Sequence, residues 1–181
     1  METFTKVKRF LANPGFRKQR QKILNNIDLD SIDRSIIKII SGFLKLPYCF
    51  TLQCCYGHFL YDGHEDPYSL DPLPVSEKIG DVEYKIAYIA FCIQDSPPGK
   101  ILFKKLSKVP EIDPEYIQFG SAGWFWKKQV NTYVLQVEPE RYCLRDTASI
   151  NYEEALHVER IRNLFFQRLE DIIQEMKKIS G

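Results

Sequence analysis

Apolar residues recur at helical spacing through the last part of the chain, and this pattern constrains the fold more than any other feature. Asn151, followed three residues later by Glu154, resembles a capping box, which predicts a helix from there to about Lys177. The apolar stripe of this helix comprises Val158, Ile161, Leu164, Phe165, Leu169, Ile172 and Met176. A stripe this long has to be covered, so we expect it to pack into the core.

Strand-like segments fill the middle of the chain, and helix-like segments flank them. Stretches rich in Val, Ile, Tyr and Phe predict strands over residues 48–61, 82–94, 115–119 and 124–137. Further helices are predicted over residues 16–27, 31–44 and 100–108. Residues 62–81 are predicted to be a loop, either a binding lid or a plain surface loop. This order indicates an α+β fold, a mostly antiparallel sheet with helices packed on it and a long C-terminal helix.

Charge is distributed unevenly along the 181 residues, although the net charge is only +1. The first 25 residues carry one acid, Glu2, and the basic residues Lys6, Lys8, Arg9, Arg17, Lys18, Arg20 and Lys22. We therefore expect residues 1–15 to form a basic arm in front of a single α+β domain, residues 16–181. The basic segment is either a phosphate- or RNA-binding surface or a solvated helix face.

No segment of the sequence resembles a signal peptide or a membrane span. Met1 is followed by charged residues rather than by an apolar run, and no stretch approaches the roughly 20 apolar residues of a span. The five cysteines are an odd number without the spacing of a disulfide framework. We expect free thiols, a cytoplasmic protein and no membrane partner.

The stretch YCFTLQCCYGHF, residues 48–59, concentrates the residue types that carry chemistry. Side chains alternate along a strand, which places Cys54 with the core and Cys55 with Thr51 on a polar, reachable face. Because neighbouring strand residues point apart, we expect no metal here. The alternative is a zinc site built from Cys54, Cys55, His58 and His64. Gly57 permits a bend, after which His58 can turn to either face.

Two segments resemble the wybutosine-synthesis tRNA methyltransferase family. SIDRSIIKIIS is similar to that family's Ser-Ile-Asp helix start, and CFTLQCCYGHF is similar to its Phe-Thr-Thr-Ser-Ser-Cys-Ser-Gly-Arg strand. IAFCIQDSP and YVLQVEP resemble two further strands of the family. The positions that match are Ser31, Ile32, Asp33, Phe50, Thr51, Cys55 and Gly57.

The resemblance implies a protein that binds S-adenosylmethionine and modifies tRNA. The candidate ligand-binding residues are then Asp33, Thr51, Cys55, Gly57 and His58. His58 replaces the family's arginine, and Gln94 and Gln136 stand where the family has histidines. These departures leave a second possibility, a non-enzymatic domain of the same architecture that binds a small ligand or a protein. No catalytic residue and no protein partner is assigned.

An aromatic and basic segment, WFWKK, follows residue 123. Aromatic rings beside cations suit stacking on bases together with phosphate neutralisation. The alternative is that one face of a strand is core and the lysines border it. Together with the basic segment, this gives the candidate RNA-binding residues Arg17, Lys18, Arg20, Trp124, Trp126 and Lys127.

Overall fold

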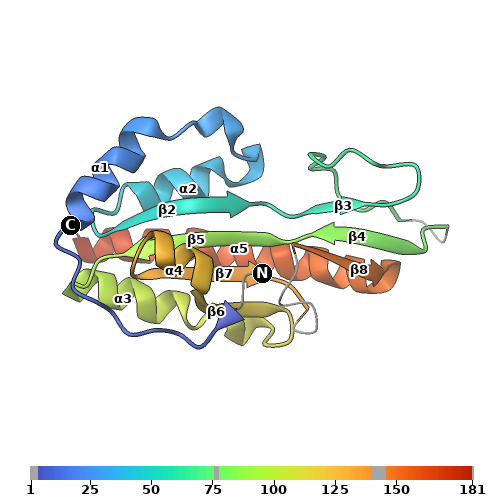
Figure 1. Cartoon of the computed structure of the whole chain (residues 1–181). Coiled ribbons are helices and arrows are strands. Elements are labelled where there is room, and N and C mark those ends of the chain that lie inside the picture. Colours follow the sequence, from blue (N-terminus) through green and yellow to red (C-terminus); the bar gives the residue numbers. More distant parts are fainter. Residues whose placement is uncertain (1–3, 76–77, 140–145, 181) are drawn as a thin grey trace.

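The computed structural model describes residues 4–75, 78–139 and 146–180. Its strands form two antiparallel sheets that follow one another along the molecule (Figure 1). The five-stranded sheet has the order β1 (Phe4–Thr5), β6 (Ile117–Ala122), β7 (Thr132–Val137), β5 (Ala87–Ile93) and β2 (Cys49–Cys55). The three-stranded sheet has the order β3 (His58–Leu60), β4 (Asp81–Lys85) and β8 (Thr147–Asn151).

Helices cover these sheets, so the predicted α+β class is confirmed. The α-helices are α1 (Phe16–Asn26), α2 (Ile37–Leu44), α3 (Pro97–Leu106), α4 (Gly123–Lys128) and α5 (Tyr152–Ser180). Three short 3-10 helices are η1 (Leu29–Ser31), η2 (Arg34–Ile36) and η3 (Val109–Ile112). Within the described residues, no helix combines the length and the apolar character needed to cross a bilayer.

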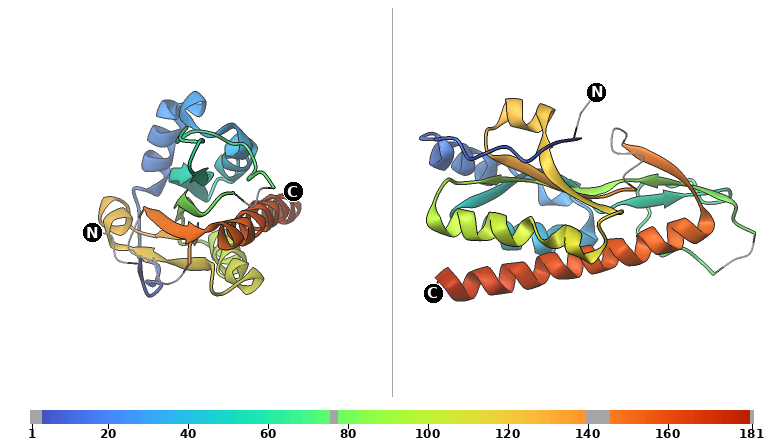
Figure 2. Two further views of the ribbon diagram at one scale, coloured as in Figure 1. Left: turned by 90° about the vertical axis from the view of Figure 1, so that its right-hand side faces the viewer. Right: turned by 90° about the horizontal axis from the view of Figure 1, so that it is seen from below.

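Helix α5 begins where the capping box predicts, and it runs along both sheets (Figure 2). The backbone N–H of Glu154 donates to Asn151 Oδ1 at 2.8 Å, which is the expected cap. The predicted apolar stripe is buried except at Leu164, which is 49% exposed. Phe166, which the stripe omits, is buried in its place.

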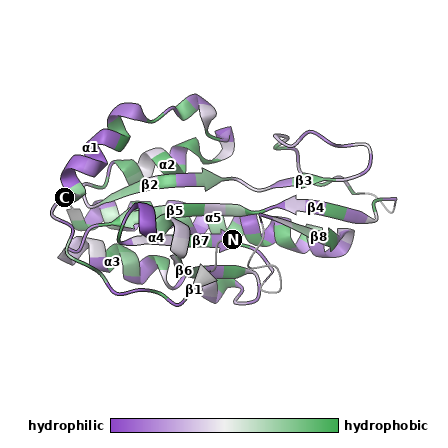
Figure 3. Cartoon of the chain, viewed as in Figure 1, coloured by the Kyte–Doolittle hydropathy of each residue, from purple (hydrophilic) through white to green (hydrophobic). Residues whose placement is uncertain are grey.

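The main core lies between the five-stranded sheet and helices α2, α3 and α5. Helix α4 covers part of the opposite face, where Phe125 packs with Ala90 and Val134. In Figure 3, the hydrophobic colour follows strand β5, which lies between β7 and β2, whereas much of α1 is hydrophilic. The two faces of the sheet are therefore covered unequally, and α1 presents a polar surface.

The two long strands predicted over residues 48–61 and 82–94 are each divided, and their halves belong to different sheets. The first ends at Cys55 because Gly57 has a positive φ of 91°, which an extended strand does not allow. The second breaks at Ile86, whose backbone N–H leaves the ladder and donates to Asp146 O at 3.1 Å. The breaks lie side by side, since β2 pairs with β5 and β3 pairs with β4.

Three other segments differ from the sequence predictions. The helix predicted over residues 31–44 becomes a regular α-helix only at Ile37, because Asp33 has a non-helical ψ of 125° and residues Arg34–Ile36 form the 3-10 helix η2. The aromatic and basic segment is helix α4 rather than a strand, so Trp124 and Trp126 do not share a strand face. Strand β8 was not anticipated, and it completes the small sheet by pairing with β4.

The N-terminal basic segment is docked along the edge of the larger sheet. Strand β1 pairs with β6, and the backbone N–H of Lys8 donates to Ser121 Oγ at 3.0 Å. The side chain of Asn131 both accepts from the N–H of Leu11 and donates to its carbonyl, each at 2.8 Å. These contacts attach the segment to the body of the fold over most of its length.

Helices α2 and α5 approach closely at Gly42, which gives a first prediction. A Cβ at this position would lie 2.7 Å from Ile173 Cδ1. Alanine normally stabilises a helix interior by about 1 kcal/mol over glycine. Here we expect Gly42→Ala to lower the free energy of unfolding by about 1–2 kcal/mol, because overpacking outweighs helix propensity.

Urea denaturation measures this effect, and Ile173→Val provides the control because it removes the opposing Cδ1 atom. Gly42→Ala should cost less in the Ile173→Val background than alone. Equal costs in both backgrounds would show that the α2–α5 contact is not the reason.

Candidate functional site

Gly57 forms a corner between strands β2 and β3, and this corner brings the reactive side chains together. A Cβ at Gly57 would lie 2.8 Å from Ala87 Cβ and 3.1 Å from the Tyr84 hydroxyl. The positive φ and the lack of space both require glycine. Residues three apart on an unbroken strand point to opposite faces. The corner instead allows Cys55 and His58 to meet.

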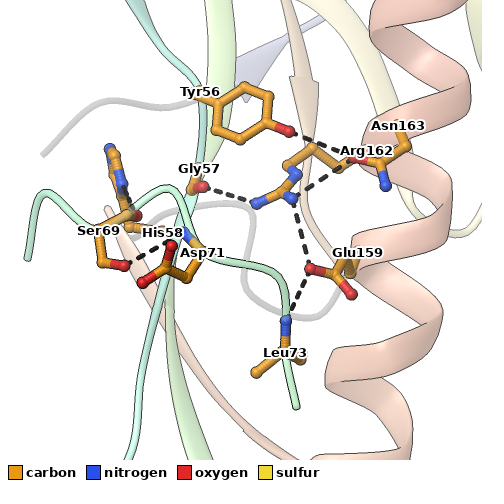
Figure 4. Close-up of polar contacts among 9 residues, drawn as sticks. All are labelled: Tyr56, Gly57, His58, Ser69, Asp71, Leu73, Glu159, Arg162 and Asn163. Carbon is orange, nitrogen blue, oxygen red and sulfur yellow. Dashed lines mark hydrogen bonds and ion pairs between the residues drawn. The ribbon is translucent and has the colours of Figure 1, made fainter. Parts of the chain in front are cut away.

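The corner is held by Arg162, a buried arginine from the middle of α5 (Figure 4). Its Nη1 donates to the carbonyl of Gly57 at 2.8 Å. The guanidinium carbon lies 4.2 Å from the ring centre of Tyr56 and 5.1 Å from that of Phe59. A cation between two rings and a carbonyl is stabilised in this position although water is excluded.

The same arginine connects the corner to the loop after β3. Arg162 Nη2 lies 3.6 Å from Glu159 Oε1, and this oxygen accepts the backbone N–H of Leu73 at 3.0 Å. The loop returns to the corner through Ser69, whose carbonyl lies 2.9 Å from His58 Nδ1. A carbonyl can only accept, so Nδ1 carries a proton, and Nε2 is the nitrogen that faces Asp33.

Asp33, Cys55 and His58 converge at this corner. Asp33 Oδ2 accepts the backbone N–H of Tyr56 at 2.8 Å and lies 3.4 Å from His58 Nε2. One ligand-type atom from each of the three residues lies within 4.8 Å of the other two. Cys55 and His58 are buried, and Asp33 is partly exposed. A carboxylate, a thiol and an imidazole nitrogen therefore share one small volume.

The protonation of this cluster follows from its contacts. The Asp33 carboxylate, followed by the Cys55 side chain, raises the pKa of His58 to about 10 against the opposing effect of burial. Burial acts to raise the pKa of Asp33, but hydrogen bonds from His58 and the Tyr56 N–H hold it below its usual value. The pair is thus a carboxylate and an imidazolium near neutral pH.

A cavity of about 350 Å³ lies along the free edge of β2, between this strand and the segment from α1 to Asp33. It is lined by Ile23, Asn26, Ile27, Asp28, Ser31, Ile32, Asp33, Thr51, Leu52, Gln53 and Cys54. Its volume is at the lower end of the range for small-molecule sites, about 300–1,000 Å³. Asp33 belongs both to the cavity wall and to the cluster with His58.

The structure brings all five candidate ligand-binding residues into one region. Asp33 and Thr51 line the cavity, Gly57 forms the corner, and Cys55 and His58 lie buried behind Asp33. The zinc alternative is only half represented, because Cys54 and His64 are outside the cluster found among the described residues.

The expected exposure of Cys55 is wrong. Cys55 is 8% exposed, whereas Cys54 is partly exposed and lines the cavity. The ladder between β2 and β5 shifts register between Thr51 and Gln53, so simple alternation fails at Leu52. Burial, followed by the charge of Asp33, raises the pKa of the Cys54 thiol to about 12.

The candidate RNA-binding residues divide into exposed and structural groups. Arg17, Lys18 and Lys127 are exposed, and Trp124 is 46% exposed with Lys128 Nζ lying 3.3 Å from its ring centre. Arg20 instead donates to the carbonyls of Leu44 and Cys49, at 2.5 and 3.2 Å. Trp126 is only 9% exposed and packs on Tyr133. Arg20 and Trp126 therefore support the fold.

A second polar group, absent from the sequence-based candidates, follows one register row across the sheet. Tyr88 pairs with Gln136, and Gln136 pairs with Gln118. The side chain of Gln136 donates to Glu138, a fully buried carboxyl whose Oε1 has no partner among the described residues. Burial raises the pKa of Glu138 to about 8.

Sequence reasoning missed Arg162 and Glu138, although one signal for Arg162 was available. Arg162 lies four residues after Val158 and three before Phe165, so it falls within the apolar stripe of α5. A charge on a buried stripe requires a partner, and the partner is the corner at Gly57. Glu138 follows a buried strand, and no local pattern marks it.

Comparisons with known proteins establish no family for the chain. No protein-family model matches it, and no curated protein matches it. Among solved structures, the chain is similar to the PH1069 protein from Pyrococcus horikoshii, with 11% identity and a TM-score of 0.46 over 91% of this chain and 93% of that one. This likeness is too remote to support a functional argument.

The corner gives a second prediction, about Arg162. Arg162→Met keeps a long apolar stem but leaves the Gly57 carbonyl without its donor, so it should lower the free energy of unfolding by about 3 kcal/mol. Arg160→Met is the matched control because Arg160 is exposed on the same helix and should change stability by less than about 0.5 kcal/mol. Urea denaturation of both variants decides; similar losses would contradict the role of the corner.

Glu138 gives a third prediction, a pH dependence of stability. The pKa of this group is raised to about 8 in the fold from an ordinary 4.5, so its protonated form is favoured in the folded protein. The contribution of Glu138 to the free energy of unfolding is fully present below pH 4.5, and it is lost as the pH rises through about 8.

Glu138→Gln removes the ionisable group while it keeps the shape of the side chain. The variant should exceed the wild type in unfolding free energy by about 1–3 kcal/mol at pH 9, and the difference should shrink towards pH 5. Melting temperatures across this range measure it. A difference that stays constant with pH would contradict the burial of a neutral carboxyl.

Proposed function

We propose that the cavity between α1 and β2 binds S-adenosylmethionine and that the protein uses it to modify tRNA. The observation that carries this proposal is the position of Asp33, a negatively charged side chain at the junction of the cavity and the His58 cluster. The resemblance of the Asp33 and Cys55 segments to the wybutosine-synthesis tRNA methyltransferases names the same residues independently.

The chemistry of the cavity wall favours a cationic or hydroxyl-bearing ligand. Two carboxylates, Asp28 and Asp33, line the cavity, and no lysine or arginine is among the described residues that line it. A phosphorylated ligand would meet negative charge, whereas a sulfonium or a ribose diol finds acceptors. Ile23, Ile27 and Leu52 provide apolar surface against which a purine ring can pack.

The atoms of Asp33 are arranged for such a ligand. Both recorded contacts of the carboxylate, with the Tyr56 N–H and with His58, use Oδ2. Oδ1 is therefore the oxygen that can accept from a ligand hydroxyl or ammonium. His58 keeps the carboxylate ionised and fixes its direction, which reduces the ordering cost of binding.

Helix α1 connects the ligand site to an RNA-binding surface. Its C-terminal part lines the cavity through Ile23 and Asn26, and Arg17, Lys18 and Lys22 on the same helix are exposed. Exposed cations beside a cofactor pocket would hold phosphates near the reacting group. Trp124, with Lys127 and Lys128, offers a second exposed aromatic and basic surface on α4.

The second candidate function is a non-enzymatic small-ligand domain, and the loss of two RNA candidates favours it. Arg20 and Trp126 serve the fold rather than an exposed RNA-binding surface. The four free cysteines among the described residues fit a reducing compartment, and we propose the cytoplasm.

Calorimetric titration with S-adenosylmethionine tests the proposed ligand. The fourth prediction compares two substitutions of opposite charge at Gln53. This exposed side chain lines the cavity. Gln53→Lys places a cation beside a cationic ligand and should weaken binding about 5–10-fold, whereas Gln53→Glu should bind at least as well as the wild type. Equal effects of the two substitutions would contradict a site that selects positive charge.

Filter binding with bulk tRNA at several salt concentrations tests the second partner. The double variant Arg17→Glu with Lys18→Glu should weaken tRNA binding. It should also reduce the slope of log affinity against log salt concentration by about one to two released ions. The matched control, Lys104→Glu with Lys108→Glu, changes exposed lysines at the end of α3 and should not. Ligand binding without tRNA binding would establish the non-enzymatic candidate, and the loss of both would overturn the proposal.

A further inference from the structure

We propose that Asp33, Cys55 and His58 form a zinc site with one open coordination position. This inference requires neither S-adenosylmethionine nor tRNA, although Asp33 also lines the cavity. It also replaces the sequence-based zinc alternative with a different set of ligands.

The three side chains offer the donor types that zinc prefers. Thiolate sulfur, imidazole nitrogen and carboxylate oxygen bind zinc at about 2.0–2.3 Å, which places tetrahedral donors roughly 3.3–3.7 Å apart. The separation of Asp33 Oδ2 from His58 Nε2 is already 3.4 Å, and all three donor atoms lie within 4.8 Å of one another. A small contraction of the thiol position completes a three-point site.

The orientation of His58 distinguishes a metal site from a catalytic triad. In a catalytic triad, the two ring nitrogens of the histidine have different partners: one faces the nucleophile, and the other faces the carboxylate. Here Nδ1 is bonded to the backbone carbonyl of Ser69, and Nε2 faces Asp33, so neither nitrogen is reserved for the Cys55 thiol. A backbone carbonyl on one nitrogen that aims the other is the usual support of a metal-binding histidine.

The surroundings support the ligands and leave room for a fourth. The Tyr56 N–H fixes Asp33, and the corner held by Arg162 fixes the spacing of Cys55 and His58. Cys55 and His58 are buried, which favours a neutral assembly of zinc with a thiolate and a carboxylate. Asp33 opens to the cavity, so the fourth position is available to water or to a ligand there.

Metal binding exchanges protons for the ion. The zinc ion takes the place of the hydrogen on His58 Nε2, and the Cys55 thiol becomes a thiolate. Both protons go to the solvent, and no oxidant or reductant is required.

The test is a titration of chelator-treated protein with zinc, and then with cobalt as a spectroscopic probe, in the absence of S-adenosylmethionine and RNA. We expect one equivalent of zinc, and a thiolate-to-cobalt charge-transfer band with the absorption of tetrahedral cobalt. Cys55→Ala should abolish the band, and His58→Gln should weaken zinc binding at least 10-fold. Circular dichroism confirms that each variant is folded.

Two substitutions serve as matched controls because they remove the same chemical groups nearby. Cys54→Ala removes the neighbouring thiol, and His64→Gln removes a histidine of the following loop; both should keep stoichiometric zinc and the cobalt band. Loss of the site in either control, or cobalt binding without thiolate absorption, would overturn the assignment. If Cys55→Ala does not fold, the cobalt spectrum of the wild type decides, since substoichiometric binding or a missing band refutes the site.

Failure of this test leaves the proposed function separate. A protein that binds zinc but neither S-adenosylmethionine nor tRNA keeps the metal site and loses the proposed function. If the protein binds S-adenosylmethionine but not zinc, the metal site is refuted and the proposed ligand is kept.

Discussion

The hydrogen bond from Arg162 to the carbonyl of Gly57 is the contact on which the arrangement of the two sheets depends. A glycine with φ of 91° has many alternatives in the unfolded chain, and nothing local selects this conformation. The buried guanidinium selects it, because its charge needs an acceptor and stacking partners that only this corner supplies. The hydrogen bond and the two ring contacts thus offset the cost of burying the charge, and they also hold the bend of the strand.

Through this contact, helix α5 reaches the corner between the two sheets. The helix passes along the small sheet and continues along the large one (Figure 2). Its hydrogen bond to the Gly57 carbonyl places Arg162 at the junction of β2 and β3. The apolar stripe fixes the rotation of the helix, since a turn about its axis would expose the stripe. That rotation aims Arg162 at the corner and Glu159 at the loop, so the hydrophobic core determines the geometry of the polar site.

The fold class and the C-terminal helix could be predicted because they depend on periodicity, which single residues do not disturb. The division of the strands could not, because it depends on Gly57 and on the partner that holds it from a hundred residues away. The prediction that Cys55 is exposed failed for a similar reason, since a register shift near Leu52 leaves no mark in the sequence. Asp33 was identified through family resemblance, whereas its contact with His58 required tertiary structure.

The spacing of Cys55 and His58 shows how a local rule can hold and still mislead. Adjacent strand residues point apart, and Cys54 indeed lies outside the cluster of Asp33, Cys55 and His58. The same rule would separate Cys55 from His58, because three is an odd number of steps. It does not apply, since the strand ends between them at a glycine that reverses the direction of the side chains. In this chain, the glycine of the Cys-x-Gly-His sequence is therefore the point at which Cys55 and His58 converge, because Arg162 holds the corner from a distant part of the sequence.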